Sequence, residues 1–320
     1  YLLSSKDDLR NNFSDKHQGA AMITYVHGDL FYSPARVLVN PVNTVGAMGS
    51  GTAYDFKRFF PDMYEHYRDL CQRDEFAIGQ LMLYRTPHKW ILNFPTKRHF
   101  RATASLDHIE DGLKKFVRIY AEQDITSVSF PALGIDEDGL AWDEVKPIME
   151  SYLEPLPMSV YVHIHTDKTA DARRSTRAMK TWLTGRPSTI SFEVFWKELL
   201  RIVQIDIDAK SHIPFKAVAT PAKGRQRLSL KLTPRRGDSV FLPETQLRDL
   251  WQYVTRAGYV LPQNLPAGLE QHASMIMILL AQVSLLRPIQ LERQDGDVFT
   301  GLQYIPPIER KPNTQIVTAN

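Results

Sequence analysis

Residues 37–51 read Val-Leu-Val-Asn-Pro-Val-Asn-Thr-Val-Gly-Ala-Met-Gly-Ser-Gly, and this stretch decides the fold of the first half of the chain. The apolar run from Val37 to Val39 predicts a buried strand. Two asparagines and three glycines follow, and Ala53 begins a predicted helix. A strand that leads through a glycine-rich turn to a helix N-terminus presents backbone N–H groups beside the positive end of the helix dipole. The stretch therefore predicts a site for a phosphorylated ribose compound, with the asparagine amides facing the sugar hydroxyls.

Strands and helices alternate through the first half of the chain. Apolar runs predict strands at 22–26, 37–40, 81–85, 90–94, 127–133 and 159–165. Helical spacing of apolar residues predicts helices at 52–69, with a break at Pro61, at 105–123 and at 142–153. This alternation predicts a three-layer α/β domain with a mixed or mainly parallel sheet. Ligands bind such sheets at the carboxyl ends of the strands, where the glycine-containing loops after Asn40 and Leu133 begin.

The composition is that of an ordinary globular protein, since 43% of the 320 residues are hydrophobic and 23% are charged. This length is sufficient for two domains with separate cores. The sequence contains no run of about eighteen apolar residues, so we expect no membrane span. Cys71 is the single cysteine. It excludes an internal disulfide and indicates a reducing compartment, so we expect a cytoplasmic protein.

Charge divides the chain into two parts of opposite sign. Residues 22–167 contain 14 Lys and Arg against 20 Asp and Glu, whereas residues 168–320 contain 22 against 13. Such an asymmetry indicates two domains with different partners. We expect an N-terminal extension at 1–21, the α/β domain at 22–167, a basic linker at 168–188 and a smaller α+β domain at 189–320.

Helical and alternating patterns predict the smaller domain. Helices are expected at 192–203, from Pro243 to a C-cap at Gly258, and at 269–283, and β-hairpins are expected across 213–242.

A basic run lies within the predicted hairpins. Residues 209–237 contain eight basic residues and no acidic residue. Alternate residues of a strand share one face, so the run can form a basic stripe. Such a stripe fits a phosphate backbone or an acidic protein partner, or else it is a solubilising sheet edge. The candidates for contact with nucleic acid are Lys223, Arg225, Arg227, Lys231, Arg235 and Arg236.

Four blocks of the first half occur in the order seen in a known family. They are Val26-His-Gly-Asp-Leu30, the stretch at 39–51, Asn93-Phe-Pro-Thr-Lys-Arg-His-Phe-Arg101 and Phe130-Pro-Ala-Leu-Gly-Ile-Asp-Glu-Asp-Gly139. Together they resemble a macrodomain, and more narrowly a DarG-type DNA ADP-ribosyl glycohydrolase, which opposes a toxin that ADP-ribosylates thymidine in DNA. The resemblance covers roughly residues 22–166. It implies a three-layer macrodomain with a mixed central sheet and a ligand that contains ADP-ribose.

The resemblance implies a role for each matching residue. Asp29 would accept a hydrogen bond from the adenine amino group, and Asn40 and Asn43 would hold the distal ribose. Residues 46–51 and 134–139 would form the two phosphate loops. The implied ligand contacts are Asp29, Leu30, Asn40, Asn43, Thr44, Gly46, Met48, Gly49, Ser50, Gly51, Thr52, Pro95, Thr96, Gly134, Ile135, Asp136, Glu137, Gly139 and Leu140. The candidate contacts with nucleic acid in this half are Arg98 and Arg101.

Two residues, Lys97 and Asp138, are implied by the resemblance to carry out catalysis. Removing ADP-ribose from a base requires attack on the anomeric carbon and a proton for the leaving nitrogen. An amine that has lost its proton can attack this carbon and form an imine-like adduct. A carboxyl group on the opposite side can donate or accept the proton. Lys97 and Asp138 have the chemistry for these two roles if the fold brings them together.

The second implied phosphate loop carries three carboxylates, Asp136, Glu137 and Asp138. Like charges about 4 Å apart repel by roughly 4 kcal/mol at an effective dielectric constant of about 20. Three arrangements avoid this repulsion: at least two carboxylates point to solvent, the ligand is not the standard one, or a divalent cation joins the site. The sequence has no cluster of His and Cys that predicts a zinc site, and we expect no cofactor.

Three functions fit these patterns. The leading interpretation is an enzyme that hydrolyses ADP-ribose from nucleic acid, with thymidine in DNA as the favoured base. Its role would be that of an antitoxin, or a role in antiviral defence or repair, with a toxin or defence protein as partner. The alternative is a non-catalytic sensor that binds ADP-ribose or a related nucleotide signal and has a nucleic-acid-binding second domain. In a third interpretation the macrodomain is vestigial and the protein is a nucleic-acid-binding accessory.

Overall fold

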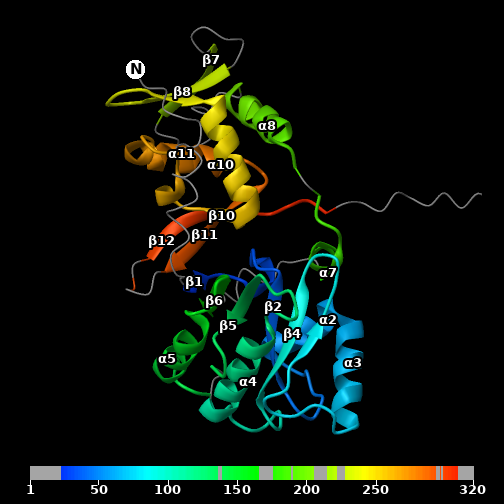
Figure 1. The fold of residues 1–320 in the computed structure, drawn as a ribbon. Helices are drawn as coiled ribbons and strands as arrows, with labels where there is room; N and C mark the ends of the chain where they lie inside the picture. The colour runs from blue at the N-terminus through cyan, green and yellow to red at the C-terminus, as the bar shows by residue number, and fades with distance from the viewer. Residues whose placement is uncertain are drawn as a thin grey trace, which may run out of the picture. The chain divides into compact units, whose positions relative to one another are not determined.

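The structure is a computed structural model that describes residues 23–135, 139–165, 176–188, 190–204, 215–221, 228–292, 296 and 298–308. The described chain forms two compact units (Figure 1). The first contains the residues up to Gly185 together with Glu292 and Gly296, and the second contains those from Arg186 to Leu291 and from Val298 onward. Among the described helices, none combines the length and the apolar character needed to cross a bilayer.

The first unit contains a mixed sheet whose strands lie in the order β1-β6-β5-β2-β4-β3. Neighbouring strands are parallel except for β3, which is antiparallel to β4. The strands are β1 (Ile23–His27), β2 (Val37–Asn43), β3 (Met82–Tyr84), β4 (Trp90–Lys97), β5 (Ser127–Pro131) and β6 (Ser159–His165). This arrangement confirms the predicted α/β fold with a mixed sheet.

Helices cover both faces of this sheet (Figure 1). The helices are η1 (Leu30–Tyr32), α2 (Gly51–Phe59), α3 (Pro61–Gln72), α4 (Leu106–Ile119), α5 (Trp142–Leu153) and α7 (Thr176–Thr184). Helices α4 and α5 share one apolar core with Val37 and Val39 of β2. Helices α2, α3 and α7 share a second core with Leu38 of the same strand. Strand β2 is therefore buried on both faces, which explains its continuous apolar run.

Two positions in the helices show how the sequence sets local structure. The expected helix at 52–69 is two helices, because Pro61 begins α3 at its first turn and cannot continue α2. Gly112 of α4 allows the helix to approach the sheet closely, since a Cβ there would lie 2.2 Å from Cζ of Phe94. A larger residue at Gly112 would force α4 away from β4.

The residues before β4 hold helix α7. Lys89 is 3% exposed, and its Nζ donates to the carbonyl oxygens of Ser33 and Ala35, each at 2.7 Å. The same Nζ lies 5.3 Å from the ring centroid of Trp182 in α7. His88 Nδ1 donates to the carbonyl oxygen of Trp182 at 2.7 Å. Burial lowers the pKa of Lys89 to about 7, and it lowers the pKa of His88 to about 4.

The second unit is an α+β arrangement, as expected. Its strands are β7 (Phe215–Pro221), β8 (Leu228–Pro234), β9 (Val240–Pro243), β10 (Tyr259–Val260), β11 (Leu286–Glu292) and β12 (Val298–Tyr304). Its helices are α8 (Phe192–Gln204), α10 (Glu244–Ala257), η2 (Pro262–Asn264), η3 (Glu270–His272) and α11 (Ala273–Leu280). Strands β7, β8 and β9 form one antiparallel sheet, and β10, β12 and β11 lie side by side in that order.

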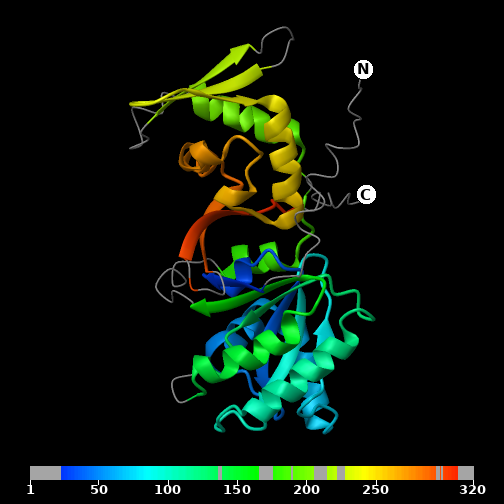
Figure 2. The same cartoon turned by 60° about the vertical axis from the view of Figure 1, so that its left-hand side comes forward.

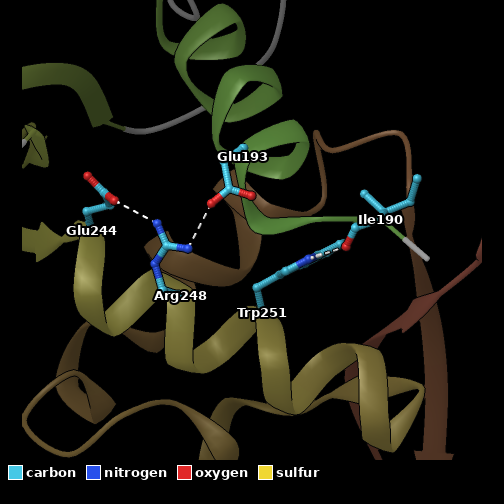
Figure 3. Close-up of polar contacts among 5 residues, drawn as sticks. All are labelled: Ile190, Glu193, Glu244, Arg248 and Trp251. Atoms are coloured by element: carbon cyan, nitrogen blue, oxygen red, sulfur yellow. Dashed lines mark hydrogen bonds and ion pairs between the residues drawn. The ribbon is translucent and has the colours of Figure 1, made fainter.

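Polar and aromatic contacts join helices α8 and α10, and Figure 3 shows the polar ones, made by Arg248 and Trp251. Arg248 of α10 donates to Glu193 at 2.9 Å and to Glu244 at 3.0 Å. The hydrogen bond from Arg248 is the main cause that lowers the pKa of Glu193 to about 2. Trp251 stacks on Phe195 with ring centroids 4.2 Å apart. Its Nε1 also donates to the carbonyl oxygen of Ile190 at 3.1 Å (Figure 3). Helix α10 is thus fixed to α8 by both polar and apolar contacts.

The end of the second unit differs from the sequence expectation. The helix expected at 269–283 is divided into η3 and α11, and α11 ends at Leu280. Strands β11 and β12 had no counterpart in the expected elements. Strand β11 contains Pro288, which usually marks a non-strand or an edge, and Gly301 interrupts the apolar pattern of β12. These residues explain why the strand pattern was weak.

Candidate functional site

The carboxyl ends of three adjacent strands form the candidate site. Strands β5, β2 and β4 are neighbours and parallel, so the loops that follow them leave the same edge of the sheet. The register pairs Asn40 with Asn93 and, after a bulge, Asn43 with Lys97. The fold therefore brings Lys97 next to Asn43, one of the two asparagines predicted to contact the ligand.

Asn40 and Asn93 form a buried amide pair inside the sheet edge. Both are 0% exposed, and Asn40 Nδ2 donates to Asn93 Oδ1 at 2.8 Å. The Oδ1 atom of Asn40 has no hydrogen-bond partner among the residues that the structure describes. Buried acceptors nearly always have a partner, so this oxygen is available to a hydroxyl group or a water. Asn93 was not among the predicted site residues, although its place opposite Asn40 in an apolar strand is the signal that could have identified it.

The Asn43 side chain differs from that of Asn40, because it forms hydrogen bonds with the backbone of the loop that follows it. Its Oδ1 accepts from the backbone N–H groups of Val45 at 3.1 Å and Ala47 at 3.2 Å, and its Nδ2 donates to the carbonyl oxygen of Ala47 at 2.7 Å. The hydroxyl of Tyr67 donates to the Asn43 carbonyl oxygen at 2.6 Å. The geometry thus assigns the Asn43 amide to loop closure, as in an Asx turn.

The first loop is anchored on both sides. Thr44 donates from its backbone N–H and from Oγ1 to the carbonyl oxygen of Arg98, at 3.1 and 3.0 Å. Gly46 has φ +80°, and a Cβ at this position would lie 3.3 Å from Cβ of Cys71. Met48 is 2% exposed and belongs to the apolar core, so it anchors the loop to that core.

The N-terminus of α2 is open beside this loop. Ser50 is the N-cap residue and makes no side-chain cap hydrogen bond. Gly51 has φ +59°, and a Cβ there would meet nothing within 4 Å. Gly49, Ser50 and Gly51 are exposed and Thr52 is half-buried. Open N–H groups at a helix N-terminus are the feature that anions bind.

The loop after β5 is closed by a backbone hydrogen bond. Leu140, which is half-buried, donates from its N–H to the carbonyl oxygen of Gly134 at 2.9 Å. Gly134 has φ +70°, and a Cβ there would lie 2.9 Å from Cβ of Ala104. This loop therefore packs against the segment that follows β4. Ile135 is 38% exposed and Gly139 is exposed. The three carboxylates Asp136, Glu137 and Asp138 lie outside the described residues.

The loop after β1 is held by a buried histidine. His163 of β6 is 4% exposed, and its Nδ1 donates to the carbonyl oxygen of Gly28 at 2.9 Å. Burial lowers the pKa of His163 to about 4, so the ring is neutral at neutral pH. Asp29 caps η1 by accepting from the N–H of Phe31 at 2.9 Å, and Leu30 is buried. His163 was not among the predicted site residues, although a polar residue within an apolar strand is a signal that could have identified it.

The segment after β4 is basic and aromatic. Pro95 and Thr96 are buried, Lys97 is half-buried, and Arg98 and Arg101 are exposed.

Between these two arginines lies an exposed aromatic ring. Phe100 is 49% exposed, and the Arg101 guanidinium lies 5.4 Å from its ring centroid. Cations and an exposed ring at one loop are features that nucleic acids recognise.

The remaining predicted contacts with nucleic acid are basic residues of the second unit, distant in sequence from the candidate site. Lys231 is half-buried on β8, and Arg235 and Arg236 are exposed in the turn after it. The other basic residues of the predicted stripe lie outside the described residues; they are Lys223, Arg225 and Arg227. Within the described part of the chain, no group of three or more His, Cys, Asp or Glu side chains is placed to hold a metal ion.

Known proteins match the region of the chain that contains this site. Residues 39–149 match the family model described as Macro domain. The chain is 42% identical over 139 residues to a DNA ADP-ribosyl glycohydrolase of Thermus aquaticus, a match that covers 42% of this chain and 39% of that protein. A DNA ADP-ribosyl glycohydrolase of Mycobacterium tuberculosis is 42% identical over 140 residues, covering 42% and 40%. The chain thus spans about two fifths of the length of these curated relatives.

Two solved structures match the same region of the chain. The macrodomain of Thermus aquaticus DarG is 40% identical over 45% of this chain and 98% of that chain, with a TM-score of 0.43. The structure of Thermosipho africanus DarTG in complex with ADP-ribose is 34% identical over 49% and 46%, with a TM-score of 0.44. The family match and the sequence identity over this region indicate that the first unit has the macrodomain fold.

Proposed function

We propose that the macrodomain hydrolyses ADP-ribose from nucleic acid and that thymidine in DNA is its favoured modified base. The observation that carries the proposal is the position of Lys97, which ends β4 opposite Asn43. Asn93, the partner of Asn40, precedes it by four residues on the same strand. The identity of 42% to DNA ADP-ribosyl glycohydrolases over this domain supports the same reaction.

The proposed binding mode uses the groups at the sheet edge. The free Oδ1 of Asn40 accepts from a ribose hydroxyl, and the open N-terminus of α2 receives a phosphate. Asp29 accepts from the adenine amino group at the end of β1, where His163 fixes the backbone of Gly28. Asn43 acts indirectly, because it shapes the loop between the ribose and the phosphates.

Lys97 is the proposed nucleophile. Its neutral amine attacks the anomeric carbon, the bond from this carbon to the base breaks, and the proton that the amine loses passes to the base nitrogen. Water then hydrolyses the lysine adduct and restores the amine with release of ADP-ribose. Asp138 is proposed to carry the proton between these groups.

The exposed segment after Lys97 supports nucleic acid as the substrate. Arg98 and Arg101 can contact phosphates of the modified strand, and Phe100 offers a ring on which a neighbouring base can stack. An ADP-ribosylated protein side chain would use neither the charges nor the ring in this way. The domain is therefore expected to release ADP-ribose faster from DNA than from protein.

A side-by-side turnover experiment tests the proposal. The full chain is incubated with a thymidine-ADP-ribosylated oligonucleotide and with an ADP-ribosylated protein, and free ADP-ribose is measured. We expect release from DNA, and a loss of about a thousand-fold or more in Lys97→Ala. The matched control is Lys115→Ala, at an exposed lysine of α4. Unchanged turnover in Lys97→Ala would contradict the proposed role of Lys97 as the nucleophile.

The same experiment, together with calorimetry, distinguishes the proposed hydrolase from a non-catalytic sensor. Asn40 and the α2 N-terminus support binding of ADP-ribose whether or not Lys97 reacts. If the wild-type chain binds ADP-ribose in calorimetry but releases none from any substrate, the domain is a sensor for this ligand. If no heat of binding is measured and DNA binding is salt-sensitive, the vestigial interpretation is supported.

The proposed biological role is reversal of a modification made by a partner enzyme. One relative of this chain is a DNA ADP-ribosyl transferase–DNA ADP-ribosyl glycohydrolase fusion protein of Thermosipho africanus. We therefore propose that this chain counteracts a toxin that ADP-ribosylates DNA, as an antitoxin or in defence or repair. Co-expression with a thymidine-specific DNA ADP-ribosyl transferase tests this role, since the wild-type chain should restore growth and Lys97→Ala should not.

A further inference from the structure

The three-stranded sheet of the second unit has one covered face. Phe215, Leu230 and Val240 belong to an apolar core that also contains residues of α8 and α10. Figure 2 shows α8, in green, against one side of these strands. The residues that alternate with the core residues point to the opposite side, which we call the outer face. Its residues include Lys216, Val218, Thr220, Lys231, Thr233 and Phe241.

One row across the outer face combines apolar and cationic side chains. The strand register pairs Val218 with Lys231 and Lys231 with Phe241. Val218 is 53% exposed and Phe241 is 54% exposed. The Lys231 ammonium lies 5.6 Å from the ring centroid of Phe241. An aromatic ring, a lysine and a branched apolar side chain thus lie side by side on three neighbouring strands.

The surroundings of this row are basic. Lys216 is exposed on β7, and Arg235 and Arg236 are exposed in the turn between β8 and β9. Asp238 is an exposed acidic residue in the same turn. The excess of cations selects an anionic partner, whereas the half-exposed aromatic ring selects a partner with flat apolar groups. Nucleic acid has both properties.

We propose that the outer face binds single-stranded nucleic acid. Phe241 stacks on a base, Val218 contacts a base or sugar beside it, and Lys231 and Lys216 contact phosphates. A sheet with exposed aromatic and basic residues is a known way to bind unpaired strands, because every base has a π-face for stacking. A duplex hides its base faces, so it cannot use Phe241. The inference concerns unmodified strands and does not depend on the proposed hydrolysis of ADP-ribose.

Binding of a fluorescent oligo-dT to the full chain, measured by anisotropy, tests this surface. We expect Phe241→Ala to weaken the binding of the single strand about five-fold or more, and Phe241→Tyr to retain the binding, because stacking is preserved. Lys231→Ala should reduce the slope of log K against log salt by about 0.7, the value for one phosphate contact on a single strand.

Matched controls keep the test specific to the outer face. Val194 is 50% exposed on α8, and Lys197 is an exposed lysine of the same helix, so Val194→Ala and Lys197→Ala should bind like the wild type. Wild-type affinity in Phe241→Ala with an unchanged circular dichroism spectrum would overturn the proposal. Tighter binding to the duplex, or an absence of binding to the single strand at low salt, would also overturn it and leave the face to an acidic protein.

Discussion

One lysine directly precedes strand β4 and another ends it, and the two lysines have opposite surroundings. Lys89 precedes the strand, is 3% exposed and donates to two carbonyl oxygens. Lys97 ends the strand, is half-buried and lies beside Asn43. Helix α7 covers the first end, whereas loops lead away from the second. The same residue type therefore stabilises packing at one end of the strand and lies at the candidate site at the other.

Three polar side chains, His88, Lys89 and Asn40, also differ between the ends, although Trp182 Nε1 at the covered end has no hydrogen-bond partner among the described residues. At the covered end, His88 and Lys89 both donate to backbone carbonyls, and burial lowers the pKa of each. At the carboxyl end, Asn40 keeps an acceptor without a partner among the described residues. Buried polar groups that satisfy one another serve stability, and a polar group that lacks a partner in the protein is a candidate for ligand contact.

The largest expected effect is on stability at the covered end. Lys89→Ala leaves the carbonyl oxygens of Ser33 and Ala35 without donors, so it should lower the free energy of unfolding by about 3 kcal/mol. Lys97→Ala, at a half-buried position, should lower it by less than about 1 kcal/mol. Urea unfolding of both variants at pH 7.5 measures the difference. Equal losses of unfolding free energy in the two variants would show that Lys89 contributes no more to stability than Lys97 does.

The sequence predicted most of the first unit because its apolar spacing is regular. The predicted strand at 90–94 and the helix at 142–153 are seen, although the strand extends to Lys97. Burial of Lys89 could not be predicted, since it depends on α7, whose Trp182 lies far along the chain.

The candidate site was predicted only in outline. Glycines and asparagines at a strand end locate a ligand edge, because their chemistry is local to a few residues. The residue types alone do not show which amide atoms already form hydrogen bonds within the protein. Asn40 and Asn43 look equivalent in sequence, but in the folded loop the Asn43 amide is hydrogen-bonded to the backbone and Asn40 Oδ1 has no partner among the described residues. Asn93 and His163 were missed because each acts across the sheet on a residue distant in sequence.

A smaller effect is expected in the pH dependence of stability. Burial lowers the pKa of Lys89 from 10.5 to about 7 in the folded state, so the unfolded chain binds more protons between these values. The fold should therefore gain stability as the pH rises, by about 2 kcal/mol between pH 7 and pH 9. Lys89→Met keeps the apolar stem and should lack this gain. The check is urea unfolding of wild type and variant at both pH values, and parallel pH profiles would contradict it.

The smallest expected effects are at the carboxyl end, where substitutions of Asn43 and Asn40 should change different quantities. Asn43→Ala removes the acceptor of the Val45 and Ala47 N–H groups, so it should lower the free energy of unfolding by about 1.5 kcal/mol. Asn43→Asp keeps this acceptor and should recover part of the loss. Asn40→Ala should instead act mainly on ligand affinity, weakening ADP-ribose binding about ten-fold in calorimetry, because a hydrogen bond of about 1.4 kcal/mol is lost. If Asn43→Asp is as unstable as Asn43→Ala, loop closure by its side-chain oxygen is not the reason for its position, and the ribose role implied by the sequence regains support.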